Sequence, residues 1–225
     1  MIKGVLFDMD GILIDTEVLG QKIMIEVAAR FGYEFTAEMY FLILGCNHDL
    51  TRDIMLDHYG DAFPYEDVMQ GFYDAFLDTA RAGKLPLKKG LTECMEGLRA
   101  RGIPCALATS TERSIVETYI KGTPEMQGIF TATVCGREVQ KSKPEPDIYI
   151  EAARQLSLAP AECLGVEDSR NGLRSLRSAG CKSVMIPDLL PYDESFAGIV
   201  DYKLDDLTQL CPLIDRINLE ATIKG

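Results

Sequence analysis

The first eleven residues, MIKGVLFDMDG (1–11), decide the fold. An apolar run over residues 2–7 leads directly into Asp8, Asp10 and Gly11. A short apolar run bounded by turn residues is typical of a strand buried inside a sheet. Side chains at i and i+2 of an extended segment point the same way, and glycine lets the chain turn sharply. We therefore expect a buried strand whose end presents two adjacent carboxylates, although such acids can also be ordinary turn formers.

Similar apolar runs recur along the chain and alternate with helical patterns. Further strands are expected at 103–109, 131–135, 163–166 and 183–186. Two of the helices between them are marked by apolar residues on one face: Leu91, Met95 and Leu98, and then Ile148, Ala152 and Leu156. This alternation predicts an α/β fold, a Rossmann-like, mostly parallel sheet with helices on both faces. Right-handed crossovers then bring the carboxyl ends of the strands to one edge.

Residues 16–84 depart from this alternation, because they show helical periodicity and no convincing strand. Helical stretches are expected near 19–31, 49–58 and 65–80. We expect a core domain formed by residues 1–15 and 85–225, with 16–84 inserted as an all-helical cap and hinges near 15–16 and 83–88. An insertion at this edge would cover the place where open α/β sheets bind ligands. Helices packed beside the sheet are the alternative.

A second pair of acids, Glu167 and Asp168, ends the run 163–166 in the same way. If this strand is a parallel neighbour of the first, the new pair meets Asp8 and Asp10 at one edge. Four carboxylates in one place repel each other unless a cation is present. Oxygen ligands favour Mg²⁺, which keeps water and phosphate in its remaining positions. The alternative is a solvated acidic rim on an acidic protein.

Two further segments offer groups that bind phosphate. Thr109 and Ser110 end the run 103–109 just before a helical stretch that opens at Glu112, and a helix N-terminus offers backbone N–H donors to an anion. Lys143 precedes another helical stretch. Opposite four carboxylates, its ammonium group is expected to orient them and to meet phosphate oxygens. Taken alone, the hydroxyl residues would be ordinary helix caps, and the lysine an ordinary solvated side chain.

Composition narrows the classes of partner. The 225 residues carry 23 Lys+Arg against 35 Asp+Glu, a formal net charge of -12, which excludes a general attraction to nucleic acid or to an anionic membrane. No stretch approaches the roughly 20 apolar residues of a membrane helix, and the run before Asp8 is too short for a signal peptide. The 7 cysteines form no CxxC pair, which is typical of reduced thiols. We expect a cytoplasmic protein, with a monomer as the default.

The four polar motifs described above follow one another along the chain as the motifs of the haloacid dehalogenase superfamily do, and they resemble them. The resemblance is to the branch with a small helical cap that includes β-phosphoglucomutase and many sugar-phosphate phosphatases. Asp8-Met9-Asp10-Gly11 resembles the nucleophile motif, and Glu167-Asp168 resembles the acidic metal motif. Thr109 and Lys143 resemble the hydroxyl and lysine motifs between them. The order and spacing agree over essentially the whole chain.

The resemblance implies a Mg²⁺-dependent phosphatase that hydrolyses a small phosphorylated metabolite such as a sugar phosphate. Asp8 would attack phosphorus and form an aspartyl phosphate, and Asp10 would protonate the leaving oxygen and then activate water. Mg²⁺ would be held by Asp8, the main-chain carbonyl of Asp10 and Asp168, with Glu167 acting through a water. The groups that would bind the transferring oxygens are the Thr109 side chain, the Ser110 N–H and Lys143.

The alternative within the superfamily is a β-phosphoglucomutase-type hexose phosphomutase. In such mutases the cap brings a His soon after the hinge and an Arg from its second helical region. This chain has Leu19-Gly20-Gln21 at the first place and His48 near the second, with Arg52 one turn later. Both departures favour a phosphatase.

The cap residues expected to face the substrate are Thr16, Gln21, His48 and Arg52. A third possibility, a non-catalytic phospho-ligand binder, is expected to lack Asp8, Asp10 or Lys143. All three are present, which argues for an enzyme.

Overall fold

The computed structural model describes residues 1–44, 46, 48–189 and 191–224. Within these residues, six strands form one sheet in the order β3-β2-β1-β4-β5-β6, and every neighbouring pair is parallel. The strands are β1 (Gly4–Phe7), β2 (Cys105–Thr109), β3 (Ala132–Cys135), β4 (Cys163–Glu167), β5 (Lys182–Met185) and β6 (Tyr202–Lys203). The predicted parallel α/β sheet is confirmed. Its strand ends differ from the expected ones by one or two residues, and β6 was not predicted.

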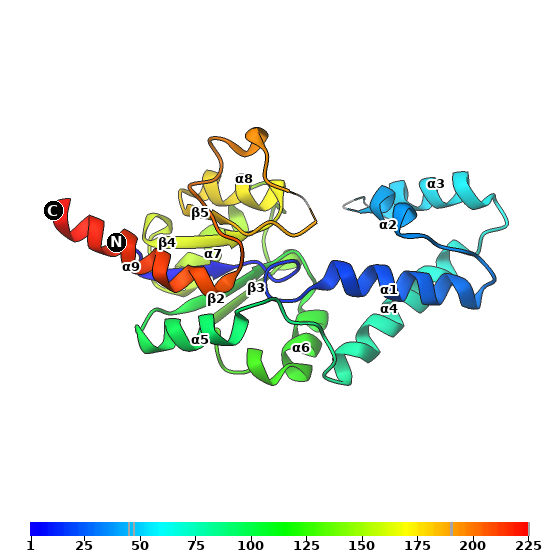
Figure 1. The fold of residues 1–225 in the computed structure, drawn as a ribbon, viewed down its shortest axis with the longest axis horizontal. Coiled ribbons are helices and arrows are strands. Elements are labelled where there is room, and N and C mark those ends of the chain that lie inside the picture. The colour runs from blue at the N-terminus through cyan, green and yellow to red at the C-terminus, as the bar shows by residue number, and fades with distance from the viewer. Residues whose placement is uncertain (45, 47, 190, 225) are drawn as a thin grey trace.

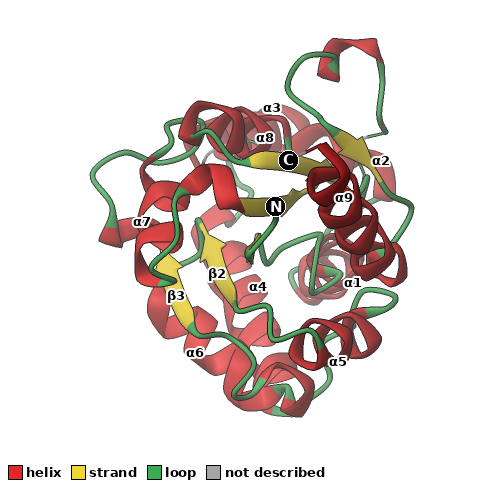
Figure 2. Ribbon diagram, turned by 90° about the vertical axis from the view of Figure 1, so that its left-hand side faces the viewer, coloured by secondary structure: helices red, strands yellow, loops and turns green. Residues whose placement is uncertain are grey.

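Helices cover both faces of the sheet (Figure 2). In the core they are α5 (Leu91–Ala100), α6 (Arg113–Gly122), α7 (Asp147–Gln155), α8 (Arg170–Ala179) and α9 (Leu210–Lys224). Alternate residues of β1 point to opposite faces: Leu6 packs with α7 and α8, whereas Val5 and Phe7 pack with α5, α6 and α9. Because both faces are covered, the two central strands β1 and β4 are buried along their whole length, and the residues of β1 are all apolar.

The position of β1 at the centre of the sheet determines where the polar residues meet. Phe7 pairs with Leu107 of β2 on one side and with Val166 of β4 on the other. The residues that follow these three strands therefore emerge together at the carboxyl edge. The two acidic pairs were expected to meet only if the strands before them are parallel neighbours, and β1 and β4 are such neighbours.

Among the described residues, four helices lie between β1 and α5, grouped at the end of the molecule toward which β1 runs (Figure 1). They are α1 (Thr16–Arg30), α2 (Ala37–Ile43), α3 (His48–Tyr59) and α4 (Tyr65–Arg81). The two chain segments that connect them to the sheet are paired with each other: Asp15 N donates to Pro86 O at 2.8 Å, and Lys88 N donates to Leu13 O at 3.0 Å. The inserted helices thus leave and rejoin the core at one place.

The inserted helices also contact the core directly through α4 and α6. The ring of Phe76 in α4 stacks on that of Tyr119 in α6, with centroids 5.8 Å apart. Nearby, a Cβ atom at Gly122 would fall 1.9 Å from the carbonyl oxygen of Ala80, so only glycine permits this approach. Among the described residues, no helix has the length and apolar character needed to cross a membrane.

Candidate active site

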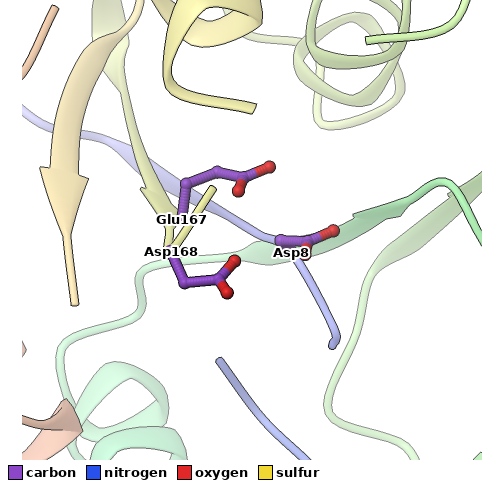
Figure 3. Close-up of side chains that lie close together, drawn as sticks. All are labelled: Asp8, Glu167 and Asp168. Atoms are coloured by element: carbon purple, nitrogen blue, oxygen red, sulfur yellow. The ribbon is translucent and has the colours of Figure 1, made fainter. Parts of the chain in front are cut away.

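Three carboxylates meet where β1 and β4 end. Asp8 follows β1, Glu167 is the last residue of β4, and Asp168 comes next. The Asp8 backbone N–H donates to Val166 O at 3.0 Å, which fixes the two strand ends side by side. One oxygen of each carboxylate lies within 4.8 Å of the others, and Figure 3 shows the three side chains extending from the strand ends to the same side. The two distant stretches of sequence therefore deliver their acids to one place.

Burial makes this cluster electrostatically unfavourable without a cation. Burial raises the pKa of Asp8 to about 7 despite the nearby Lys143, and the charges of Glu167 and Asp10 add to the rise. The pKa of Asp168 is raised to about 9, again first by burial and then by Glu167 and Asp8. An all-oxygen donor set in which burial and mutual repulsion favour the protonated carboxyl groups is suited to a hard divalent ion such as Mg²⁺, which adds positive charge to that of Lys143.

Lys143 is the buried cation of the site. Its Nζ donates to Asp8 Oδ1 at 2.7 Å, to Glu167 Oε1 at 2.6 Å and to Ala108 O at 3.1 Å. Burial alone would lower the pKa of Lys143, but the charges of Asp8 and Glu167 outweigh this effect and raise it. The ammonium group therefore stays charged and is directed at the Asp8 carboxylate.

Glu167 is fully buried and accepts four hydrogen bonds. Oε1 accepts from Lys143 Nζ and from the Tyr149 hydroxyl, both at 2.6 Å, while Oε2 accepts from Ser169 N at 3.2 Å and Ser169 Oγ at 2.9 Å. A Cβ at Gly172 would lie 1.8 Å from Oε1, so glycine is needed to make room for the carboxylate. A carboxylate has about four acceptor sites, and protein donors occupy all of them. In this arrangement Glu167 orients Lys143, and its expected role in metal binding through a water stays a prediction.

Asp10 is held by the hydroxyl group of Thr111. Its Oδ2 accepts from Thr111 Oγ1 at 2.8 Å. Burial raises the pKa of Asp10 against the effect of the Thr111 hydrogen bond, which suits a group that must carry a proton to a leaving oxygen. Thr109 is fully buried at the end of β2 and accepts from Thr111 N at 3.1 Å, and Ser110 is exposed just before α6.

A further carboxylate, Asp188, belongs to this site but was missed in the sequence. Its Oδ1 accepts from Lys88 Nζ at 2.7 Å, while its Oδ2 is buried without a hydrogen-bond partner among the described residues. A Cβ at Gly11, where φ is +74°, would lie 2.5 Å from Asp168 Oδ2 and 3.1 Å from Asp188 Oδ2. Asp188 follows β5 closely, so the rule that selected Asp8 and Asp168, an acid just beyond a parallel strand, would have found it.

The four cap residues singled out in the sequence lie in different surroundings. Thr16 lines a pocket of about 460 Å³ together with Asp10, and His48 lines an adjoining pocket of about 230 Å³. Gln21 lines neither pocket. Arg52 is half-exposed, with its Nε 3.8 Å from Glu66 Oε1.

Comparison with known proteins finds relatives along almost the whole chain. The family model of the haloacid dehalogenase-like hydrolases matches residues 5–186. Protein CbbY of Cereibacter sphaeroides is 31% identical over 220 residues, covering 93% of this chain and 94% of that protein. The phosphorylated carbohydrates phosphatase of Thermotoga maritima is 28% identical over 187 residues, covering 81% of this chain and 84% of that protein. The crystal structure of CbbY from Rhodobacter sphaeroides in complex with phosphate matches with a TM-score of 0.74 at 30% identity, covering 93% of this chain and 96% of that chain.

Proposed function

The chain belongs to the haloacid dehalogenase-like hydrolase family, and from this premise we propose that it is a Mg²⁺-dependent phosphatase of a small phosphorylated metabolite, with sugar monophosphates as first candidates. Because its relatives include proteins named as phosphatases, the chain is assigned as a phosphoric monoester hydrolase. The observation that carries the proposal is the buried contact of 2.7 Å between Asp8 Oδ1 and Lys143 Nζ, beside Asp168. A nucleophilic carboxylate, a fixed cation and a second oxygen ligand are the groups that phosphoryl transfer requires.

In the proposed reaction the Asp8 carboxylate attacks phosphorus. A bond forms between Asp8 and phosphorus, the ester P–O bond breaks, and Asp10 gives its proton to the departing alcohol oxygen. Asp10 then takes a proton from the water that hydrolyses the aspartyl phosphate. Lys143, the Thr109 hydroxyl and the Ser110 N–H bind the transferring oxygens.

The donor set described above fits a magnesium ion. Asp8, Asp168 and the main-chain carbonyl of Asp10 would hold it, and the unpartnered oxygen of Asp188 would accept a hydrogen bond from one of its waters. When bound, the ion offsets the repulsion between the Asp8 carboxylate and the phosphate. We further propose that residues 16–84 form a cap domain that limits access of water to the site.

The hexose phosphomutase remains the alternative, but the cap supports it less well. Where the mutases have their His this chain has Leu19-Gly20-Gln21, and a Cβ at Gly20 would lie 2.3 Å from the Tyr40 hydroxyl oxygen, so a larger side chain there would have to displace the end of Tyr40. A direct comparison separates the two functions. After priming with a hexose bisphosphate, a mutase forms glucose 6-phosphate from β-glucose 1-phosphate, whereas a phosphatase releases inorganic phosphate and glucose.

The proposed function is tested by inorganic phosphate release from a panel of phosphate esters with Mg²⁺. Asp8→Asn should reduce turnover by about 10⁴-fold or more, because the amide cannot form the covalent intermediate, and EDTA should stop the wild-type reaction reversibly. Asp53→Asn, at an exposed position in α3, serves as the control and should leave turnover unchanged. Readily measured hydrolysis by Asp8→Asn would remove Asp8 from its role.

A further inference from the structure

The pocket of about 460 Å³ next to Asp10 is built from both parts of the molecule. Asp10 and Thr111 form its wall on the sheet side, while Thr16 and Glu17 at the start of α1 form part of its wall on the cap side. The stacked rings of Phe76 and Tyr119 join α4 to α6 across it. Its volume is in the range of pockets that bind small ligands.

The leaving group of the substrate must occupy this pocket. On the proposed function, Asp10 gives a proton to the ester oxygen, so that oxygen lies within hydrogen-bond reach of the Asp10 carboxylate. The rest of the alcohol then extends away from the phosphate, past Asp10 and Thr111. The chemistry of the pocket wall therefore selects the alcohol part of the substrate.

Aromatic and aliphatic side chains make up more than half of the residues that line this pocket. Five of its lining residues carry aromatic rings: Tyr40, Phe72, Tyr73, Phe76 and Tyr119. Leu77 and Ile115 add further apolar surface. Rings on several sides of a pocket favour a ligand with a flat or apolar face, because stacking adds to the energy of burial.

The same wall provides no cation. Its carboxylates are Asp10 and Glu17, and none of the described residues that line it is Lys, Arg or His. Glu17 is held in place by the Tyr40 hydroxyl, which donates to its Oε2 at 3.0 Å. A second phosphate or a carboxylate that lies within this pocket would face these acids without a partner of opposite charge, because His48 lines only the adjoining pocket, and this disfavours its binding.

We propose that the substrate is the monophosphate ester of an uncharged alcohol that carries an aromatic or other flat apolar ring, and that the pocket rejects bisphosphates. Glu17 and the five rings are then the residues that determine specificity. The inference rests on the proposed function, a phosphatase of a small phosphorylated metabolite, but it replaces sugar monophosphates as the first candidates, because a ring-bearing alcohol is preferred to a small, fully polar one.

Two matched pairs of substrates test the inference. The first pair is 2-phenylethyl phosphate and ethyl phosphate, which differ mainly by the ring; kcat/KM should be at least about tenfold higher for the phenylethyl ester. The second pair is glucose 6-phosphate and glucose 1,6-bisphosphate; kcat/KM should be about 100-fold lower for the bisphosphate.

A variant with a new cation in the pocket tests the role of charge. Tyr73→Lys places an ammonium group at a half-exposed lining position and should raise kcat/KM for the bisphosphate about tenfold relative to the monophosphate, while lowering it for the phenylethyl ester. Gln70→Lys is the matched control, since it adds the same charge at an exposed position of α4 outside the pocket and should change neither ratio. Glu17→Gln keeps an acceptor for Tyr40 and should also improve the bisphosphate.

The outcomes separate this inference from the proposed function. If neither the panel of phosphate esters nor any of these four esters releases phosphate with Mg²⁺, the proposed function fails, and the inference with it. If ethyl phosphate is hydrolysed as efficiently as the phenylethyl ester, or the bisphosphate as efficiently as the monophosphate, hydrolysis stands and the inference alone is overturned. An equal effect of Tyr73→Lys and Gln70→Lys on the bisphosphate would also overturn it.

Discussion

Lys143 and Glu167 form a buried ion pair in which Nζ and Oε1 are 2.6 Å apart, and the same Nζ lies 2.7 Å from Asp8. The side chains of the pair are only 7% and 0% exposed. Removing one partner of a buried pair leaves a charge in the interior without compensation. The position of the cation is thus coupled to the stability of the whole fold.

The first prediction concerns this pair. Lys143→Met should lower the free energy of unfolding by about 3–5 kcal/mol, because Glu167 loses its buried partner. The Lys3–Glu162 pair has the same separation of 2.6 Å but is largely exposed, so Lys3→Met should cost under about 1 kcal/mol. Urea unfolding of both variants measures the difference. Equal losses would mean that burial does not control the strength of these pairs.

The second prediction concerns the proton on Asp10. Asp10→Ala should lower kcat/KM for alkyl phosphates by about 10²–10⁴-fold, because the departing alkoxide receives no proton. The loss should be much smaller for p-nitrophenyl phosphate, since its phenolate leaves without protonation. Steady-state kinetics on the two esters give the comparison. A loss of the same size for both would argue against general acid catalysis by Asp10.

The third prediction concerns Asp188, whose Oδ2 is buried without a partner among the described residues. If this oxygen orients a water on the metal ion, Asp188→Asn should raise the Mg²⁺ concentration for half-maximal activity by about 10–100-fold. Asp205→Asn removes an exposed carboxylate from a nearby segment and should leave that concentration unchanged. Magnesium titrations of activity decide between a role in metal binding and a purely structural one.

The fourth prediction is a dependence of stability on pH in the absence of metal. In the folded chain the pKa values of Asp8 and Asp168, about 7 and about 9, lie above the ordinary value of 3.8. The folded state therefore binds more protons than the unfolded state, and the free energy of unfolding falls as pH rises from about 4 to about 9. In EDTA the Tm should decrease across this window, and Mg²⁺ should restore it most at the alkaline end.

Asp168→Asn provides the control for this pH dependence. Because the amide does not titrate, the variant should show a flatter slope in EDTA and a smaller gain from Mg²⁺. A wild-type Tm that rises with pH in EDTA would contradict the assigned direction of both pKa shifts.

The strands of the core could be predicted from the sequence because each is marked by residues that are neighbours in the chain. The strands other than β6 each contain a run of neighbouring apolar residues that can be recognised in the sequence. Because right-handed crossovers bring the carboxyl ends of parallel strands to one edge, the acids that follow them, such as Asp8 and Asp168, lie at the same edge. The strand β6 was missed because its two residues are too few to show a period, and the seven-residue helix α2 has the same difficulty.

The pocket walls could not be predicted because they depend on tertiary packing. Phe72 and Phe76 lie four residues apart and look like an ordinary core face of a helix, and only the packing of α4 on α6 brings Tyr119 to them. The sequence likewise does not give the rotation of each cap helix about its own axis. That rotation directs Thr16 into the pocket beside Asp10 but leaves Gln21 out of both pockets.

The paired connections at Asp15–Pro86 and Leu13–Lys88 mean that the inserted helices leave the core and return to it at neighbouring positions. Because the insertion starts and ends at hydrogen-bonded neighbours, the distance between its two ends in the core is the same whatever the length of the insertion. An insertion of a different length could therefore join the same two neighbouring segments without altering the register of the sheet. A displacement of residues 16–84 would also have to break the packing of α4 on α6, where Phe76 stacks on Tyr119, so the junction and this packing together hold the inserted helices over the nucleophile.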